Sequence, residues 1–390
     1  MALDTGYTYD DHLAADFSAN CLRADVLLGL GSTRKWLPPK WFYDKVGSEL
    51  FEDITRLREY YPTRTERSIL SRHADAMIHA ASTDTLIELG SGSSEKTRLL
   101  LDAITAQTPG GGSYLALDVS EDALRSACAG LVAAYPRLHV AALRADFTHQ
   151  LHLLPHTGAR TVAFLGSTIG NFEPSERASF LRALRAELGD HDHFLLGADL
   201  VKPAAILVPA YDDAAGVTAA FNLNLLDVLN QRLDADFDRT AFEHVAVWDP
   251  DNDWIEMRLR AVRRTRIRIE DLDLDVSFDR GEDLRTEISA KFRREHLTRT
   301  SAQGVEGKDS DVFVAEFVVD HRPPGLSELR GGLGVGQAAR RRTPAALRNG
   351  RWLTWIGAMK NSTPTAGSGW STRTRHLAPI HLPSAEDAMA

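Results

Sequence analysis

Cysteine, long apolar runs and excess positive charge are all scarce in this chain of 390 residues. With only two cysteines, Cys21 and Cys128, it can form neither a disulfide framework nor a cysteine-rich zinc site. No apolar run approaches the roughly 20 residues that a membrane-spanning helix needs. The net charge of −9 gives no general attraction to nucleic acid or to an anionic membrane. The remaining composition, 43% hydrophobic and 25% charged residues, is that of a globular protein.

Targeting and metal-binding signals are also missing. The first 17 residues are acidic and lack the basic stretch and apolar core of a secretory signal peptide, so we expect a cytoplasmic protein. Two groups of histidines lie close together in the sequence, but neither has the spacing or the supporting cysteines of a metal site. These groups are His149, His152 and His156, and His191 with His193. We therefore expect no bound metal.

Charge is spread unevenly along the chain. Residues 321–390 contain ten Lys or Arg and three Asp or Glu, a net charge of +7, so residues 1–320 carry −16. The same segment is rich in Gly, Pro, Ser and Thr and includes three consecutive arginines at 340–342. Because such a composition rarely buries a core, we predict a mostly disordered tail from about residue 321.

Between residues 84 and 200, short apolar runs alternate with longer segments of helical period. The apolar runs are 85–89, 114–117, 139–143, 161–165 and 194–196, and the helical segments are 96–104, 120–135 and 174–188. This alternation is typical of a parallel sheet with right-handed crossovers. Ligands of such sheets bind at the carboxyl ends of the strands, so a site is expected in the loops that follow these runs.

The flanking regions follow other patterns. Before residue 80 the periodicity predicts helices over about 13–28, 50–57 and 65–81, with a proline-containing loop at 34–40. Residues 210–233 are expected to form one long helix, followed by antiparallel strands at 245–248, 254–262 and 265–272. This later block fits an insertion or a second domain better than another crossover.

The sequence Glu88-Leu-Gly90-Ser-Gly92 directly follows the first apolar run. Glycines at a strand-to-helix junction let the backbone approach a ligand without a Cβ clash. The motif is not a phosphate-binding Gly-x-x-x-x-Gly-Lys loop, and it lacks the third glycine of the dinucleotide fingerprint. Taken alone, it fits a tight turn as well as a ligand-binding loop.

Acidic residues follow the next two runs. Asp118 lies 28 residues after Gly90, where a carboxylate can accept both hydroxyls of a ribose, and it could equally cap the helix that starts near Ser120. Asp146 and Phe147 suit an adenine, although an ordinary acidic loop residue beside a core Phe explains this pair as well. In order, the three features match S-adenosylmethionine-binding methyltransferases of the Rossmann-like class, whereas a nicotinamide enzyme would need the fuller glycine pattern.

The loop after the fourth apolar run, residues 164–172, contains two glycines and Asn171. An asparagine offers both an acceptor and a donor, which suits an amine nucleophile. A polar turn without a ligand role explains the segment equally well.

Longer stretches carry a resemblance to a known family. They are 37–44 (LPPKWFYD), 47–51 (GSELF), 59–66 (EYYPTRTE), 88–92 (ELGSG), 164–171 (FLGSTIGN), 210–222 (AYDDAAGVTAAFN) and 286–292 (TEISAKF). In these stretches the chain resembles the histidine Nα-methyltransferases of ergothioneine biosynthesis, which make trimethylhistidine (hercynine) with S-adenosylmethionine. The resemblance runs in one register from about residue 10 to about residue 300, so it is far more specific than any single glycine motif.

The resemblance implies roles for individual residues. The groups that bind S-adenosylmethionine would be Gly90, Lys96, Asp118, Asp146 and Phe147. The amino and carboxylate groups of the substrate would be held by Tyr60, Asn171 and Tyr211, and its imidazole by Glu287, Ile288 and Ser289. Tyr43 and Asn171 would be the catalytic residues. Tyr43, Tyr60 or water could receive the proton that leaves the amine.

The resemblance also implies an architecture. The fold would be α/β, with a Rossmann-like class I methyltransferase sheet and a second α+β substrate-binding domain. Segments 10–64 and 200–291 would form the substrate-binding domain, segments 65–199 and 292–320 the S-adenosylmethionine-binding domain, and 321–390 an atypical tail. We expect a monomer that acts on L-histidine and binds neither nucleic acid nor a membrane.

The resemblance stops near Thr300. The family normally ends soon after this point with a Trp-rich segment and a final strand, whereas this chain continues to residue 390 without resemblance. The alternating run 311–319 (DVFVAEFVV) could replace the lost strand. A shifted reading frame is one hypothesis for the remainder, and translation of the DNA in its other frames tests it.

The sequence therefore predicts trimethylation of the α-amino group of L-histidine, the first step of ergothioneine biosynthesis. Glu287 and Ser289 favour histidine, because a buried carboxylate left unpaired by another ligand is costly. The alternatives are a methyltransferase of another amino acid or amine, a histidine- and S-adenosylmethionine-binding protein impaired by the altered C-terminus, and a nicotinamide oxidoreductase.

Overall fold

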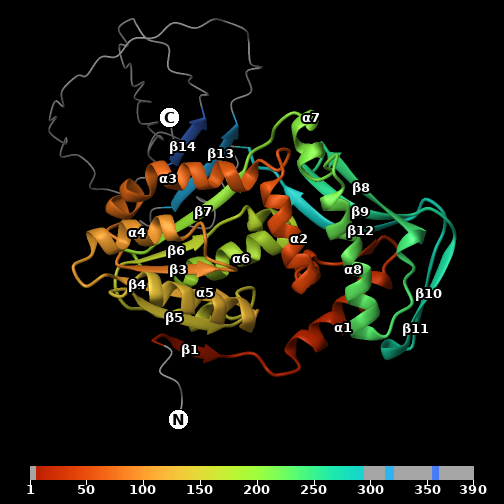
Figure 1. The fold of residues 1–390 in the computed structure, drawn as a ribbon, viewed down its shortest axis with the longest axis horizontal. Coiled ribbons are helices and arrows are strands. Elements are labelled where there is room, and N and C mark those ends of the chain that lie inside the picture. The colour runs from red at the N-terminus through yellow and green to blue at the C-terminus, as the bar shows by residue number, and fades with distance from the viewer. Residues whose placement is uncertain (1–5, 294–311, 320–353, 360–390) are drawn as a thin grey trace, which may run out of the picture. The chain divides into compact units, whose positions relative to one another are not determined.

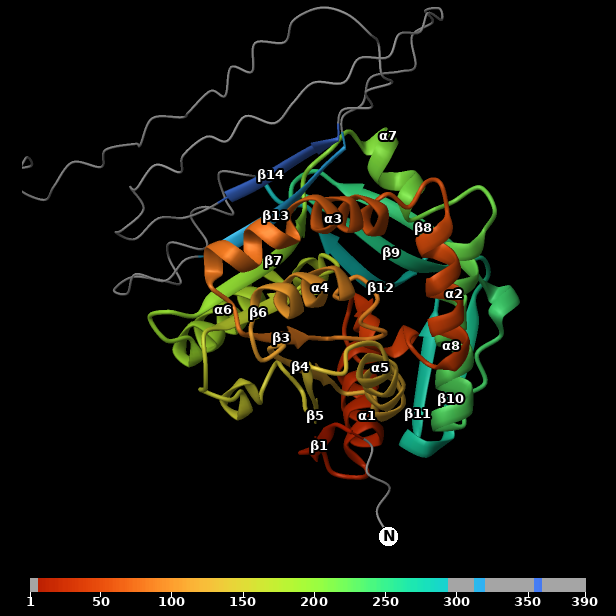
Figure 2. The same ribbon diagram turned by 60° about the vertical axis from the view of Figure 1, so that its left-hand side comes forward.

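An eight-stranded parallel sheet has the order β1-β5-β4-β3-β6-β7-β13-β14 (Figures 1 and 2). The computed structural model describes residues 6–293, 312–319 and 354–359. The strands of this sheet are β1 (Thr8–Asp11), β3 (Thr85–Leu89), β4 (Ser113–Asp118), β5 (His139–Arg144), β6 (Arg160–Phe164), β7 (His193–Asp199), β13 (Val312–Val319) and β14 (Thr354–Met359). The predicted α/β class with a parallel sheet is confirmed.

Helices cover both faces of this sheet, because its central strands are apolar on both sides. Side chains of α3 (Pro62–Ala81), α4 (Arg98–Gln107) and α5 (Glu121–Ala134) share one hydrophobic cluster with Leu86 and Ala116. The other face packs against α6 (Pro174–Glu187), whose Phe180 and Leu184 join a second cluster. The strand order reverses between β3 and β6, so the loops after these two strands flank the switch point at which such sheets bind ligands.

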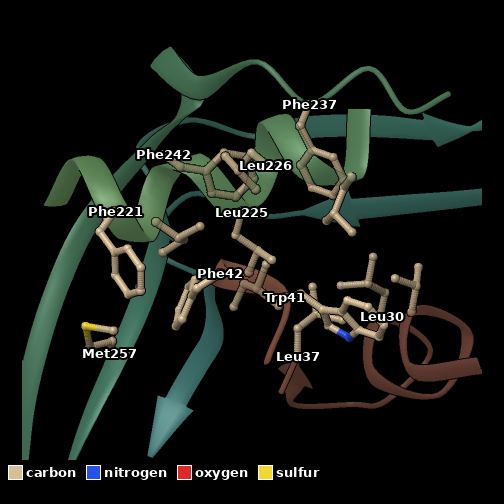
Figure 3. Packing of buried hydrophobic residues seen from close by; sticks show 14 of the residues in the cluster. Leu30, Leu37, Trp41, Phe42, Phe221, Leu225, Leu226, Phe237, Phe242 and Met257 are labelled. Atoms are coloured by element: carbon tan, nitrogen blue, oxygen red, sulfur yellow. The ribbon is translucent and has the colours of Figure 1, made fainter. Parts of the chain in front are cut away.

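A second core lies around a four-stranded sheet of order β2-β12-β9-β8. Its strands are β2 (Lys35–Trp36), β8 (Phe242–Asp249), β9 (Trp254–Ala261) and β12 (Asp283–Ala290), and a separate ribbon is formed by β10 (Thr265–Ile269) and β11 (Leu274–Phe278). Helices α1 (Phe17–Leu30), α2 (Lys45–Arg56) and α8 (Val217–Leu233) contribute to the same cluster. Figure 3 shows Phe42 and Phe221 packed near Met257, and their ring centroids are 4.6 Å apart.

Short helical segments complete the chain between these elements. They are α7 (Ala204–Leu207) and the 3₁₀ turns η1 (Pro39–Phe42), η2 (Leu151–Leu153), η3 (Thr168–Asn171), η4 (Val208–Ala210), η5 (Arg239–Ala241) and η6 (Glu270–Leu272). No helix in the described part of the chain is both long and apolar enough to span a bilayer.

A β-bulge in β12 changes which residues face the second core. Leu284 pairs with Leu259 and Arg285 with Arg258, but Glu287 then pairs with Met257, so Thr286 is the extra residue. Before the bulge, the odd-numbered residues of β12 lie on the same face of the sheet as the charged side chains of β9. After it, they share the face of Met257 and Leu259. The bulge therefore turns Glu287 and Ser289 toward the interior.

One local prediction was wrong, and another was confirmed over most of its length. The helix expected over 210–233 begins only at Val217, because the Asp213 carboxylate accepts the N–H groups of Val217 and Thr218 and so starts the helix there. The antiparallel strand expected at 265–272 is present as β10, which pairs with β11 in a separate ribbon and ends at Ile269, where η6 begins.

The predictions for the C-terminal segment can be compared with the structure at β13 and β14. The run expected to serve as a strand forms β13, which pairs in parallel with both β7 and β14. Residues 354–359, assigned to the disordered tail, form β14 instead. The rest of the expected tail lies outside the described residues.

Candidate active site

The glycine loop after β3 lies against the loops of the neighbouring strands. Gly90 has φ of +68°, its N–H donates to the carbonyl of Leu117 at 2.8 Å, and a Cβ on it would lie 3.5 Å from the Phe147 ring. Gly92, with φ of +49°, has open space where its Cβ would be. This loop therefore needs glycine for its backbone conformation and leaves room beside it.

Asp118 is held by the backbone on both oxygens. Gly92 N–H donates to Oδ2 at 3.0 Å and Ser120 N–H to Oδ1 at 2.9 Å. Burial raises the pKa of the carboxyl, and these hydrogen bonds act in the opposite direction. The Ser120 side chain caps α5, so Asp118 is not the cap. Each carboxylate oxygen keeps a second lone pair that can accept a hydroxyl.

Two buried polar residues belong to this segment, Glu88 just before the glycines and Ser91 between them. Glu88 accepts hydrogen bonds from Thr97 and Tyr114, both at 2.6 Å, and burial raises its pKa to about 7. The Ser91 hydroxyl is buried and has no partner among the described residues. Since buried polar atoms are rarely left unpaired, the Ser91 hydroxyl indicates that a polar ligand completes this loop.

Asp146 and Phe147 lie beside the same loop. The two Asp146 oxygens interact with Thr148 and His149, and these hydrogen bonds outweigh the effect of burial and lower the pKa of Asp146. The Phe147 ring packs against Phe164, with ring centroids 5.3 Å apart, and so forms an apolar wall next to Gly90. We call Gly90–Gly92, Asp118, Asp146 and Phe147 the cofactor side.

Lys96 is placed differently from the other predicted cofactor residues. Its ammonium pairs with Glu66, which also accepts the N–H of Gly166 at 2.8 Å. Within residues 6–293, no hydrogen bond or ion pair joins Lys96 to Asp118 or Asp146. Lys96 follows β3 in the chain, and Glu66 links it to the loop after β6, where the sheet reverses its strand order.

Asn171 joins the loop after β6 to β12. Its amide donates to Glu287 Oε1 and to the carbonyl of Ile288, both at 2.9 Å. A Cβ on Gly170 would lie 2.8 Å from the carbonyl oxygen of Ala290, so glycine permits this close approach. Burial raises the pKa of Glu287 to about 7, against the opposing effects of Asn171 and Lys291.

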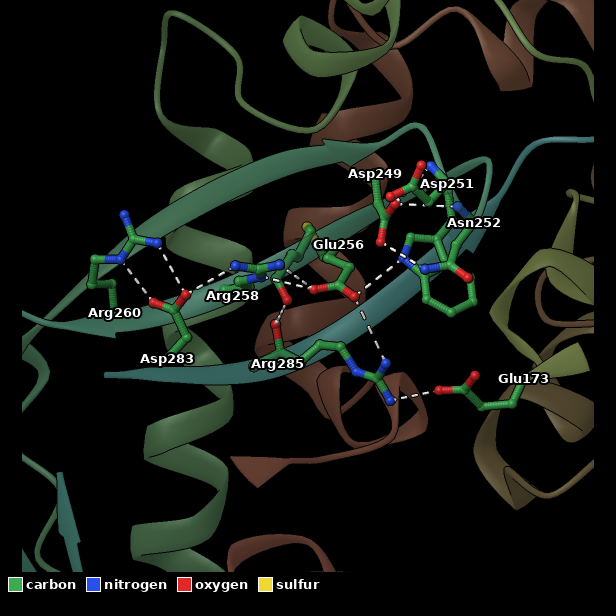
Figure 4. Close-up of polar contacts among 12 residues, drawn as sticks. Glu173, Asp249, Asp251, Asn252, Glu256, Arg258, Arg260, Asp283 and Arg285 are labelled. Carbon is green, nitrogen blue, oxygen red and sulfur yellow. Dashed lines mark hydrogen bonds and ion pairs between the residues drawn. The ribbon is translucent and has the colours of Figure 1, made fainter. Parts of the chain in front are cut away.

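Arg285 makes a second link between β12 and the loop that contains Asn171. It pairs with Glu173 at 2.7 Å, at the start of α6 (Figure 4). On the same face of the sheet, Asp283 pairs with Arg258 at 3.0 Å and with Arg260 at 2.8 Å. These ion pairs fix the charged face of β12, and the opposite face carries Glu287.

Three predicted tyrosines gather near Glu287. The ring centroids of Tyr60 and Tyr211 are 6.2 Å apart, and those of Tyr43 and Phe51 are 5.5 Å apart. Tyr43 exposes 51% of its surface, yet desolvation by the surrounding protein and the charge of Glu287 raise its pKa. Desolvation also raises the pKa of Tyr60 well above its ordinary value.

A buried charged network, not predicted from the sequence, lies beside these tyrosines. Lys291 donates to the hydroxyls of Tyr211 at 2.7 Å and Ser289 at 2.8 Å, and its ammonium is 3.3 Å from Asp199. The side chains of Lys291 and Asp199 are both 0% exposed. Tyr61 donates to Asp199 at 2.5 Å. Alternation could have indicated Lys291, since it follows Glu287 and Ser289 at intervals of two in a strand.

Tyr211 is also held through its backbone. The Nε2 atom of His244 lies 2.8 Å from the Tyr211 carbonyl oxygen, Asn222 lies 2.8 Å from the other ring nitrogen, and Thr286 donates to Asn222 at 2.7 Å. Burial lowers the pKa of His244, so its ring is neutral and donates through Nε2. We call Tyr60, Asn171, Tyr211, Glu287 and Ser289, with Lys291, the substrate side.

A short path of contacts connects the two sides. Glu66 holds Lys96 and Gly166, and the adjacent Ser167 accepts the N–H of Asp199 at 3.1 Å. Asp199 in turn contacts Lys291. The structure thus brings the predicted cofactor and substrate residues to one region at the carboxyl ends of the parallel strands, and places Lys96 between them.

Comparison with known proteins adds independent information. Residues 22–311 match the model of a family described as histidine-specific, SAM-dependent methyltransferases. A histidine N-alpha-methyltransferase of Mycolicibacterium smegmatis is 53% identical over 294 residues, covering 75% of this chain and 91% of that protein. One of Mycobacterium tuberculosis is 50% identical over 286 residues, covering 73% and 88%. Ergothioneine biosynthesis protein 1 of Schizosaccharomyces pombe is 33% identical, covering 55% of this chain and 29% of that protein.

Proposed function

Since the chain belongs to the family of histidine-specific, S-adenosylmethionine-dependent methyltransferases, we propose that it methylates the α-amino group of L-histidine. We propose three successive transfers that yield hercynine, as the first step of ergothioneine biosynthesis. The observation that carries the proposal is the hydrogen bond between Asn171 and Glu287. It places a candidate amine-binding group next to a candidate ring-binding group.

The cofactor side fits S-adenosylmethionine. Asp118 has a lone pair free on each oxygen for the ribose hydroxyls, and Phe147 offers a flat apolar wall for adenine. The buried Ser91 hydroxyl, which has no partner among the described residues, can form a hydrogen bond with a polar group of the ligand. Gly90 lets the backbone come close, and the Lys96 ammonium, which pairs with Glu66, has further N–H groups for a carboxylate. When bound, S-adenosylmethionine would supply a methyl group that an unprotonated amine can attack, with the thioether S-adenosylhomocysteine as the leaving group.

On the substrate side, the proposed catalytic work is positioning. Both donors of the Asn171 amide are used by Glu287 and Ile288, so its oxygen remains to accept an N–H of the substrate amine. The raised pKa values of Tyr43 and Tyr60 keep both hydroxyls protonated, so they can orient the amine without acting as anionic bases. We therefore assign the departing proton to water at the exposed side of Tyr43.

We also propose that the two cores correspond to two domains. The cluster around the four-stranded sheet draws its buried residues from Leu22 to Tyr61 and from Leu207 to Leu284, which supports residues 10–64 and 200–291 as the substrate-binding domain. The clusters of the parallel sheet lie between Ile69 and Ala198, which supports 65–199 with 292–320 as the cofactor-binding domain.

Incubation of the pure chain with S-adenosylmethionine and L-histidine tests the proposed function. Mass spectrometry should show histidine that has gained one, two and three methyl groups. Methylation of another amino acid in a substrate panel, with none of histidine, would replace the proposed substrate. Calorimetric binding of histidine without any methyl transfer would instead indicate a binding protein.

A further inference from the structure

The Lys291 ammonium has three N–H groups, and the structure supplies three acceptors for them. They are the Tyr211 hydroxyl at 2.7 Å, the Ser289 hydroxyl at 2.8 Å and a carboxylate oxygen of Asp199 at 3.3 Å. The side chain is fully buried, so water does not compete for these protons. Tyr211 and Asp199 outweigh the effect of burial and raise the pKa of Lys291, so the ammonium is charged.

The two hydroxyls are also hydrogen bonded to each other, at 2.8 Å. Burial raises the pKa of Tyr211, so both hydroxyls keep their protons. One of these two protons lies between the oxygens, and the other has no protein acceptor within residues 6–293. Since Lys291 already donates to both oxygens, the hydroxyl pair has one remaining proton that it can donate to a ligand.

Glu287 lies on the same face of β12 as Ser289 and offers the opposite character, an acceptor. A neutral imidazole carries one N–H donor and one nitrogen acceptor, whereas an imidazolium carries two donors. The substrate side thus presents one acceptor and one donor to a ring that has one of each. An imidazolium would instead bring an N–H group against the outward hydroxyl proton of the Tyr211–Ser289 pair, and the two donors would repel each other.

We propose that Lys291 is a positioning residue that fixes the Tyr211–Ser289 hydroxyl pair as a hydrogen-bond donor, so that the site selects the neutral imidazole of histidine through its acceptor nitrogen. This inference rests on the proposed function, because it takes histidine as the ligand. It adds a specificity role for a residue that does not itself touch the substrate. The hydroxyl pair acts toward the ring as a donor and not as an acceptor, because the charged Lys291 ammonium donates to both of its oxygens.

The test compares two ligands that differ in the ring acceptor. L-Histidine carries it, whereas the two pyrrolylalanines each keep one ring N–H and lack the acceptor nitrogen. Calorimetry without cofactor, at about pH 8 where free imidazole is neutral, gives the ratio of their dissociation constants. For the natural chain we expect histidine to bind about tenfold more tightly than the better pyrrolylalanine, the size of one lost hydrogen bond.

In Lys291→Met the preference should fall to about twofold or less, because the hydroxyls are no longer forced to donate outward. The matched control is Lys202→Met. Lys202 pairs with the same Asp199 and donates to the Leu200 carbonyl, but among the described residues it forms no hydrogen bond or ion pair with Tyr211 or Ser289. This control should lose stability and keep the tenfold preference. A merely structural role for Lys291 would weaken both ligands equally and leave the ratio unchanged, which would overturn the inference.

Two further measurements keep the test decisive. If Lys291→Met does not fold, Lys291→Gln replaces the ammonium by a neutral amide whose oxygen can take a hydroxyl proton, and it should also reduce the preference. A natural chain that binds histidine and the pyrrolylalanines equally would overturn the inference without any variant. Absence of histidine methylation by the natural chain would instead count against the proposed function, which separates the two failures.

Discussion

The cofactor side and the substrate side are built from different parts of the chain. On the cofactor side, Asp118 is oriented by the backbone N–H groups of Gly92 and Ser120, which lie at the ends of adjacent strands. On the substrate side, side chains orient one another across long distances in sequence, as Asn171 does with Glu287 and Tyr61 with Asp199. The first side therefore depends mainly on local backbone geometry, and the second on packing of the whole chain.

The electrostatics differ in the same way. On the cofactor side, the Asp118 carboxylate is hydrogen bonded to uncharged backbone N–H groups, whereas on the substrate side the buried ammonium of Lys291 pairs with the buried carboxylate of Asp199. A buried pair tolerates loss of one partner poorly, because the remaining charge stays without compensation. Substitutions on the two sides should thus separate into effects on folding and effects on ligand binding.

The largest difference is expected for Asp199→Ala. It leaves the ammonium groups of Lys291 and Lys202 buried without their carboxylate, which should lower the free energy of unfolding by about 3–5 kcal/mol. The control is Asp271→Ala, which removes a half-exposed partner of Arg23 and should cost at most about 1 kcal/mol. Urea unfolding measures both. Similar losses in the two variants would show that the buried network does not hold the substrate side together.

Glu287→Ala should affect ligand binding on one side only. Loss of a charged acceptor for the imidazole N–H should weaken histidine binding about thirtyfold, near 2 kcal/mol, and leave the affinity for S-adenosylhomocysteine nearly unchanged. Asp283→Ala removes a carboxylate from the same strand on the face opposite Glu287, and should leave histidine affinity within about threefold. Calorimetry with each ligand decides, and parallel loss of both affinities in Glu287→Ala would contradict its assigned role.

Asp118→Asn is the reciprocal substitution on the cofactor side. The amide keeps one acceptor oxygen but turns an NH₂ group toward a backbone N–H or a ribose hydroxyl, so the affinity for S-adenosylhomocysteine should fall about tenfold. Histidine affinity should stay nearly constant. Asp122→Asn, on the exposed first turn of α5, controls for a general change of charge. If Asp118→Asn altered histidine binding more than cofactor binding, the division into two sides would be wrong.

The cofactor side was the easier one to predict from sequence, because each of its motifs directly follows an apolar run. Gly90, Asp118 and Phe147 lie at the carboxyl ends of β3, β4 and β5, as a parallel sheet requires. The substrate side could be assembled only through a resemblance to relatives, since no local pattern links Tyr60 to Glu287. Their shared location depends on how the four-stranded sheet packs.

The bulge at Thr286 shows why the rest could not be predicted. Simple alternation along β12 places Glu287 on the charged face with Asp283 and Arg285, and one extra residue moves it to the face of Met257. Bulges have no reliable signature in a single sequence. The early start expected for α8 was wrong for a related reason, because the pattern does not show that Asp213 takes the N–H groups of the first helical turn.

The smallest expected difference concerns pH, and it separates two carboxyls of similar pKa. Burial raises the pKa of Glu88 on the cofactor side and of Glu287 on the substrate side from 4.5 to about 7. The folded state then binds more protons than the unfolded state between these values. The stabilisation is therefore fully present below about pH 4.5 and is lost as the pH rises through about 7.

Replacing either Glu88 or Glu287 by Gln should reduce the fall in unfolding free energy between about pH 6 and pH 7 by about 1 kcal/mol. Saturating histidine should erase only the part due to Glu287, because the ring N–H stabilises that carboxylate, whereas Glu88 remains bonded to Thr97 and Tyr114. Urea unfolding at both pH values, with and without histidine, measures this. If histidine flattened the pH dependence of Glu287→Gln as strongly as that of the natural chain, Glu287 would not be the group that the ligand meets.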